Sequence, residues 1–233
     1  MLKFILNIFY PKRCMFCNEI LDNNSKYYCK KCYYKLPFIE DKVCLVCGRE
    51  IYGEHKLCLS CRTHKTYIDV NYPAFTYSGN IEEALKKFKF AGKMWYHKPF
   101  AKLIYDNIKD KVSNIDYIVY PPINKKTFYK RGYNQMELIA KDLSQLLNVK
   151  MLKKCIFKTR ENEKQSLTSG KLRYENVRGA FAVNNKFKET INGRNVLLLD
   201  DVMTTGATIN ECARMLKLSG AKSVISSTLC IVK

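Results

Sequence analysis

The segment spanning residues 195–208 constrains the fold more strongly than any other part of the chain. Residues 196–199 are all apolar, and so short a run is typical of a buried parallel strand. Asp200 and Asp201 stand where this strand is expected to end, and the small residues 204–208 follow. Apolar residues then recur with helical period up to a terminating glycine. The segment therefore predicts a strand, a tight loop and a helix.

The predicted loop has the composition of an anion-binding site. Backbone N–H groups and the dipole at a helix N-terminus attract a phosphate, and Gly206 lets the backbone approach it closely. Asp200 and Asp201 would repel a phosphate, so they are better placed to accept hydrogen bonds from sugar hydroxyls or to approach a hydrated Mg²⁺. The chain contains neither GxxxxGK[ST] nor GxGxxG, so no other nucleotide motif competes.

This pattern resembles the loop with which type I phosphoribosyltransferases bind 5-phosphoribosyl-1-diphosphate (PRPP). The resemblance implies that Asp200 and Asp201 contact the ribose hydroxyls, that residues 202–208 hold the 5-phosphate, and that Mg²⁺ accompanies PRPP. The PRPP-binding residues that it predicts are Asp200, Asp201, Val202, Met203, Thr204, Thr205, Gly206, Ala207 and Thr208.

Eight of the eleven cysteines lie in the first 61 residues, and all eight belong to CxxC pairs. Two such pairs complete a tetrahedral Cys₄ zinc site. A disulfide scaffold is the rival interpretation, but it needs an oxidising compartment, and the first residues do not read as a cleavable signal peptide. We therefore expect two Zn²⁺ ions. Their predicted ligands are Cys14, Cys17, Cys29, Cys32, Cys44, Cys47, Cys58 and Cys61.

The spacing leaves the pairing of these ligands open. Sequential sites would join the first pair with the second and the third with the fourth, whereas a cross-braced arrangement would join the first with the third. Large apolar residues are too few here for a core, so metal binding should supply the folding energy. We expect chelation to unfold residues 1–61 and to leave PRPP binding largely intact.

The net charge of +20 is unevenly distributed, because residues 121–178 contain 14 Lys and Arg against 5 Asp and Glu. Such a balance suits polyanions such as PRPP, diphosphate or nucleic acid. A second apolar run, residues 115–120, is followed by a basic loop and an amphipathic helix, which predicts a second anion site at the same sheet edge. Residues 155–181 read as a long, mobile functional loop. The candidates for binding diphosphate or nucleic acid are Lys125, Lys126, Lys130, Arg131, Arg160, Lys171 and Arg173.

Together these elements predict an α/β fold with two parts. Residues 67–233 are expected to form a phosphoribosyltransferase type I-like parallel sheet with flanking helices, and residues 1–66 a small zinc-ribbon module. The first thirteen residues are too few to span a bilayer, and they predict either a short helix packed on the module or a weak interfacial anchor. We expect a cytoplasmic protein, at the inner face of the membrane if the anchor is used.

The whole chain resembles the ComF family of bacterial competence proteins. The match includes the CxxC pairs, FKFAGK at residues 88–93, KRGYNQ at 130–135 and LLLDDVMTTGAT at 197–208. It also includes Thr159, Arg160, Gln165 and Leu167, and R-x-x-N-V-x-G-A-F at residues 173–181. The resemblance implies a role in natural transformation beside a competence helicase that pulls single-stranded DNA inward, with single-stranded DNA and PRPP as ligands.

Two functions of different classes follow. The first is a DNA-handling accessory protein that binds single-stranded DNA, with PRPP as ligand or regulator. The second is a working phosphoribosyltransferase of nucleotide or nucleobase metabolism. No general base and no base-recognition segment can be read from the sequence, so the fold alone does not establish turnover.

Overall fold

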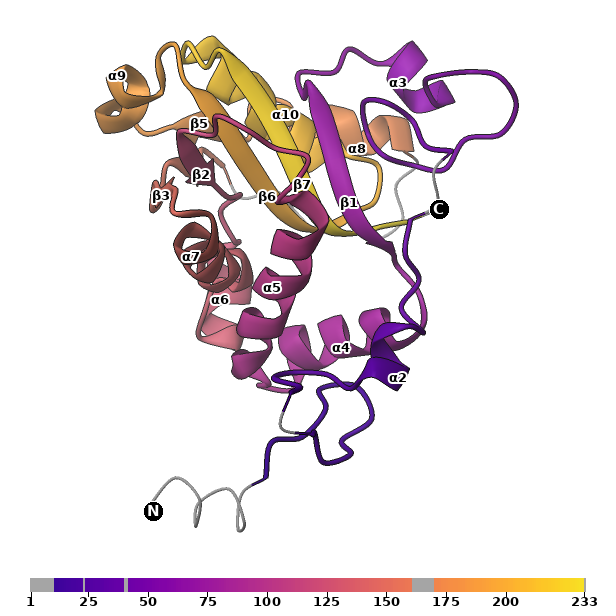
Figure 1. Ribbon diagram of the computed structural model, residues 1–233. Helices are drawn as coiled ribbons and strands as arrows, with labels where there is room; N and C mark the ends of the chain where they lie inside the picture. The colour runs from indigo at the N-terminus through magenta and orange to yellow at the C-terminus, as the bar shows by residue number, and fades with distance from the viewer. Residues whose placement is uncertain (1–10, 23, 40–41, 161–169, 233) are drawn as a thin grey trace.

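The computed structural model describes residues 11–22, 24–39, 42–160 and 170–232, with residues 170–173 described by their backbone only. Its main feature is a parallel sheet in which the described strands are ordered β1-β7-β6-β2-β3 (Figure 1). The predicted parallel α/β fold is thereby confirmed. The strands of this sheet are β1 (Val70–Thr76), β2 (Tyr117–Val119), β3 (Lys150–Met151), β6 (Asn195–Met203) and β7 (Ser223–Ile231).

Helices cover both faces of this sheet because its central strands are apolar on both sides. Leu197 and Leu199 of β6 lie in one core with α4, α5 and α7, while Val196 and Leu198 lie in a second core with α10. This alternation is the period of two that a strand imposes on its side chains. The longer helices are α4 (Gly79–Phe90), α5 (His97–Ile108), α6 (Lys125–Arg131), α7 (Gln135–Leu147), α8 (Gly170–Val177) and α10 (Ala207–Leu218). The shorter ones are α2 (Lys30–Tyr33), α3 (Leu59–Thr63), η1 (Met94–Tyr96), η2 (Asn185–Phe187) and α9 (Lys188–Ile191).

Strand β6 is longer than its apolar run predicts. It continues through both acids to Met203 because β7 pairs with it along this whole length, with Asp200 opposite Thr228. On its other side β2 pairs with β6 only as far as Leu198. The chain continues from β2 to β3 on one side of the sheet and from β6 to β7 on the other. The two acids therefore lie at the point, between β2 and β6, where the direction of the strand order reverses. Open α/β sheets bind their ligands at such a switch point.

The region predicted to be a long loop, residues 155–181, contains regular structure. Strands β4 (Ile156–Lys158) and β5 (Phe181–Val183) form an antiparallel pair, and α8 precedes β5. Ile156, Phe181 and Val183 are buried in the second core, and this burial stabilises strands too short for their periodicity to be recognised in the sequence. Residues 161–169 of the predicted functional segment lie outside the described residues.

The two ribbons of the cysteine-rich part lie apart from each other (Figure 1). The first ribbon (residues 12–33) lies beside α4 and α5, whereas the second ribbon (residues 42–63) lies at the far end of β1, beside α8 (Figure 1). Met15 is buried with the first core of the sheet, and Cys44 and Cys47 are buried with the second. Each ribbon therefore rests on a different face of the α/β domain.

The predicted N-terminal helix or anchor lies largely outside the described residues, which begin at Pro11. Within the described part of the chain no helix is long and apolar enough to cross a membrane.

Candidate ligand site and metal centres

The paired acids lie in a half-buried position at the carboxyl end of β6. A carboxylate oxygen of Asp200 accepts a hydrogen bond from the backbone N–H of Asp201 at 2.9 Å. Asp201 forms an ion pair with Lys89 of α4, with 2.8 Å between Oδ2 and Nζ. Burial and the neighbouring Asp201 carboxylate raise the pKa of Asp200 to about 7, although the Asp201 N–H and Lys89 oppose this shift. The two acids thus place carboxyl groups side by side, and carboxylate oxygens accept hydrogen bonds such as those of sugar hydroxyls.

The loop after β6 presents unpaired backbone donors. Gly206 is the N-cap of α10 and has a φ of 83°, a left-handed conformation that favours glycine. A Cβ at this position would lie 2.5 Å from Met203 Cε. Among the described residues nothing accepts a hydrogen bond from the backbone N–H groups of Thr204, Thr205 or Gly206. This loop, residues 203–208, has the free N–H groups and the helix N-terminus of an anion-binding site, and we call it the phosphate loop.

The predicted cations are distributed over several places rather than gathered at one. Arg131 lies over the ring of Phe90, 5.1 Å from its centroid, and its pKa is lowered by burial but raised by Asp201, so it lies within electrostatic reach of the acids. Lys125 and Arg160 line a separate groove, and Lys126 and Lys130 are exposed on α6. Lys171 and Arg173 belong to the part of α8 whose side chains are not described.

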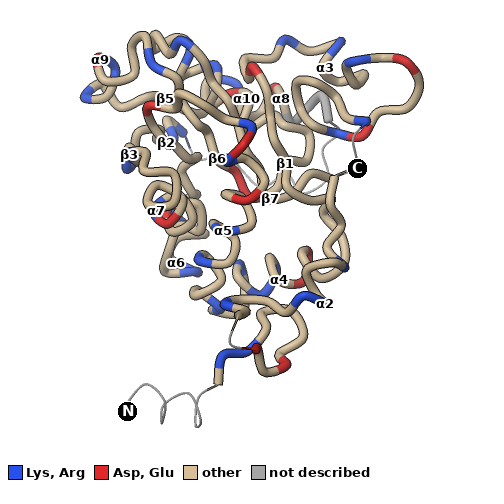
Figure 2. Tube along the Cα trace, in the orientation of Figure 1, with Lys and Arg blue, Asp and Glu red and all other residues tan. Residues whose placement is uncertain are grey.

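Figure 2 shows the red acidic stretch of β6 near the centre of the molecule, with blue cationic positions on α4 and α6 below it. Lys89 of α4 was assigned no role from the sequence, although it lies in the FKFAGK segment and pairs with Asp201. The sequence signal for a role in the site was weak, because a lysine on a helix that carries other lysines is usually expected to be exposed to solvent. Arg49 and Tyr174 were also missed, and both hydrogen-bond to carbonyl oxygens of the phosphate loop.

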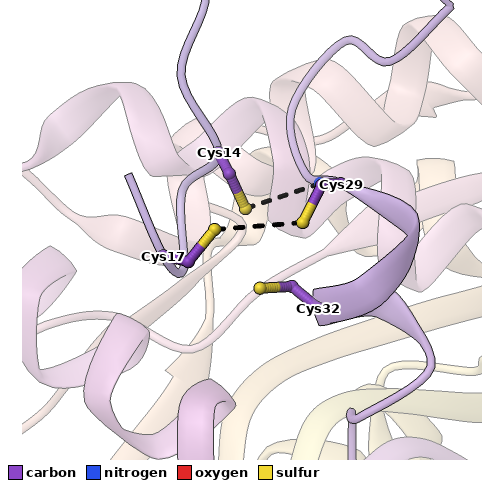
Figure 3. Close-up of side chains that lie close together, drawn as sticks. All are labelled: Cys14, Cys17, Cys29 and Cys32. Atoms are coloured by element: carbon purple, nitrogen blue, oxygen red, sulfur yellow. Dashed lines mark hydrogen bonds between the residues drawn. The ribbon is translucent and has the colours of Figure 1, made fainter. Parts of the chain in front are cut away.

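The eight predicted metal ligands form two groups in the described part of the chain, and the pairing is sequential. One group is Cys14, Cys17, Cys29 and Cys32 (Figure 3), and the other is Cys44, Cys47, Cys58 and Cys61. The cross-braced alternative is excluded.

The sulfur geometry fits zinc. Within each group all sulfurs lie within 4.8 Å of one another, with 3.9 Å between Cys17 and Cys29 and 3.6 Å between Cys47 and Cys58. Zinc bonded to four thiolates at about 2.3 Å places neighbouring sulfurs roughly 3.8 Å apart. Hydrogen bonding from Cys61 lowers the pKa of Cys47 against the opposing effect of burial, which favours the ionised thiolate that zinc binds. Two structural Cys₄ sites account for all eight CxxC cysteines.

Fold and site together define a phosphoribosyltransferase-type α/β protein that carries two cysteine ribbons. Two family models match accordingly: a double zinc ribbon domain over residues 5–65 and a phosphoribosyl transferase domain over residues 137–232. The two models together give the combination expected from the resemblance to the ComF family, a double zinc ribbon followed by a phosphoribosyltransferase domain.

Three relatives illustrate the similarity. Competence protein F of Haemophilus influenzae is 27% identical over 93% of this chain and 95% of its own length. Competence protein ComFC of Bacillus subtilis is 28% identical over 85% of this chain and 81% of its own length. DNA utilization protein YhgH of Escherichia coli is 33% identical over 49% of each chain.

Proposed function

We propose that this protein handles single-stranded DNA during DNA uptake and that its phosphoribosyltransferase-type site binds PRPP with Mg²⁺. The observation that carries the proposal is the similarity to two competence proteins over 93% and 85% of the chain. In this proposal the protein works in the cytoplasm beside a competence helicase, and its first residues form either a short helix packed on the ribbon or a weak anchor at the inner face of the membrane.

A basic and aromatic groove beside α6 supports the DNA-binding part. The groove encloses about 520 Å³ between α6 and the β4–β5 pair, and we call it the α6 groove. Phe128, Tyr129 and Phe157 line it and are 44%, 84% and 44% exposed. Its charged lining residues are Lys125, Glu137, Lys154, Lys158 and Arg160. Aromatic rings beside cations are what a flexible single strand uses for base stacking and phosphate contacts.

The geometry of the sheet edge supports PRPP as the small ligand. Asp200 and Asp201 offer acceptors for ribose hydroxyls, and the phosphate loop offers free N–H groups beyond them. Lys89 pairs with Asp201 and Arg131 lies within its electrostatic reach, so both are cations that can supply countercharge to a diphosphate beside the acids. These same observations favour the second candidate function, phosphoribosyl transfer to a nucleobase or related acceptor.

Calorimetric titration with PRPP and Mg²⁺, and separately with a short single-stranded oligonucleotide, tests both parts. We expect PRPP binding that Asp201→Asn weakens, and DNA binding that weakens steeply with added salt. Absence of DNA binding at low salt would contradict the proposal. Release of diphosphate from PRPP in the presence of one acceptor would instead establish the enzyme.

A further inference from the structure

The second ribbon is docked on β1 through backbone contacts. The carbonyl oxygen of Val46 accepts a hydrogen bond from Asn71 N–H at 2.7 Å, and that of Cys47 accepts one from Asn71 Nδ2 at 2.9 Å. Gly48 packs so closely that an added Cβ would lie 2.3 Å from Pro73 Cδ. The ribbon therefore has a fixed position relative to the sheet.

From this position the second ribbon reaches the phosphate loop. Arg49 Nη2 donates a hydrogen bond to the carbonyl oxygen of Thr204 at 2.5 Å. The hydroxyl of Tyr174 donates one to the carbonyl oxygen of Thr205 at 2.9 Å, and its ring stacks on His64, just after α3, with centroids 4.7 Å apart. The carbonyl groups of two successive loop residues, Thr204 and Thr205, are thus held from outside the loop, while the N–H groups of the same residues have no acceptor among the described residues.

The segment that follows the second ribbon is tied to the same region. Asn210, in the first turn of α10, accepts a hydrogen bond from Tyr67 N–H at 2.7 Å. Its side-chain amide donates to the carbonyl oxygen of Lys65 at 3.0 Å. Both the loop and the helix that follows it are therefore braced by residues of, or next to, the second ribbon.

The first ribbon provides an internal comparison, because the two have the same local fold. Cys14 N–H donates to Glu19 O at 2.8 Å, and the equivalent bond from Cys44 to Arg49 is 2.7 Å. The intervening Asn18 and Gly48 are both left-handed, with φ of 64° and 71°. Position 19 carries an exposed glutamate where position 49 carries the arginine that reaches the phosphate loop. The contact is therefore a property of one ribbon and not of the ribbon fold.

We infer that the second ribbon is a rigid support for the phosphate loop, that Arg49 is a positioning residue for PRPP binding, and that metal at Cys44, Cys47, Cys58 and Cys61 is coupled to the affinity of this site. The inference rests on the proposed function in taking PRPP as the ligand. A loop already held in its binding conformation loses less entropy when the ligand binds, so removing the support weakens binding. Under this inference chelation of both metals weakens PRPP binding, which is the opposite of the expectation from the sequence.

The test uses full-length, zinc-loaded protein with Arg49→Gln, its conservative counterpart Arg49→Lys, and Glu19→Gln as the matched control in the first ribbon. Amide hydrogen exchange in the loop is measured without ligand at Ala207 and Asn210, whose N–H groups donate to Thr205 Oγ1 and to Gly206 O. PRPP affinity is measured by calorimetry and zinc content by metal analysis. We expect Arg49→Gln to keep two zinc ions, to exchange about tenfold faster in the loop and to bind PRPP about tenfold more weakly. Arg49→Lys should recover much of both effects, and Glu19→Gln should match the wild type.

Cys58→Ser and Cys29→Ser test the metal coupling. Each should lose one zinc ion, but only Cys58→Ser should accelerate exchange in the phosphate loop. Unchanged loop exchange in Arg49→Gln, or loss of zinc from it, would overturn the role of Arg49, and equal loop exchange in the two cysteine variants would overturn the coupling. If the wild type fails to bind PRPP while Arg49→Gln still accelerates exchange, the proposed ligand is wrong and the support of the loop stands.

Discussion

Lys89 is the cation closest to the paired acids in the described structure, and its removal should cost stability. The Lys89–Asp201 ion pair is less than a fifth exposed on either side, so Lys89→Met leaves the Asp201 carboxylate largely shielded from water, next to Asp200 and without its direct ion-pair partner. We expect a loss of about 2 kcal/mol in the free energy of unfolding. Lys86→Met is the control, since Lys86 pairs with Glu82 on the same helix but is 57% exposed. A urea titration that gives equal losses for the two variants would contradict this assignment.

The raised pKa of the Asp200 carboxyl should make the stability of the folded protein depend on pH. Because its pKa is raised to about 7 in the folded protein, the folded state holds a proton that the unfolded state releases at lower pH. The ligand-free protein should therefore lose stability as the pH rises through about 7, and Asp200→Asn should lessen this loss. Ligand affinity should change in the opposite direction, because the ionised form is the better acceptor for ribose hydroxyls. Thermal unfolding and PRPP titration at several pH values measure the two effects, and a pH profile that Asp200→Asn leaves unchanged would exclude this carboxyl.

At the scale of elements, the long periodic segments were predictable and the short ones were not. The apolar run at residues 115–120 and the amphipathic helix after the basic loop were expected from their patterns, and β2 and α7 lie there. The extension of β6 beyond Leu199 depends on pairing with β7, which no pattern within residues 195–208 encodes. Likewise, the separation of the two ribbons is decided by contacts such as Gly48 against Pro73, which join distant parts of the chain.

The docking of the second ribbon can be tested at Gly48. A side chain there meets Pro73 and must also adopt a φ of 71°, whereas Gly53 has a φ of 81° with open space around it. We expect Gly53→Ala to cost about 1 kcal/mol from backbone strain alone. Gly48→Ala should cost about 2–3 kcal/mol more because the ribbon must move away from β1. Urea unfolding of both variants measures the difference, and similar losses would show that the ribbon accommodates the added methyl group.

For the whole molecule, the sequence predicted which residues carry charge but not how they are arranged. The loop and acids of residues 200–208 could be placed because strand, loop and helix are contiguous in sequence. The cations could not, since Lys89, Arg131 and Arg160 reach different places through separate elements. The structure separates an acid-containing site at β6 from the α6 groove, so the binding of a small ligand and the binding of single-stranded DNA can be tested independently.

Binding of single-stranded DNA in the α6 groove should separate into a charge component and a stacking component. Lys125→Gln should weaken binding and reduce the slope of log affinity against log salt by about 0.7, because one phosphate contact is lost. Phe157→Ala should weaken binding about tenfold and leave the slope unchanged, because stacking releases no counterions. Fluorescence anisotropy of a labelled oligonucleotide at a series of salt concentrations measures both quantities.

Controls for this test come from outside the α6 groove. Tyr52 is 86% exposed on the second ribbon, and Lys188 is exposed on α9. If single-stranded DNA binds only in the α6 groove, Tyr52→Ala and Lys188→Gln should keep the DNA affinity and the salt slope of the wild type. Equal weakening by Lys188→Gln and Lys125→Gln would mean that the high net charge attracts DNA over the whole surface. In that case the exposed rings beside α6 would have no part in binding, and Phe157→Ala would behave as the wild type.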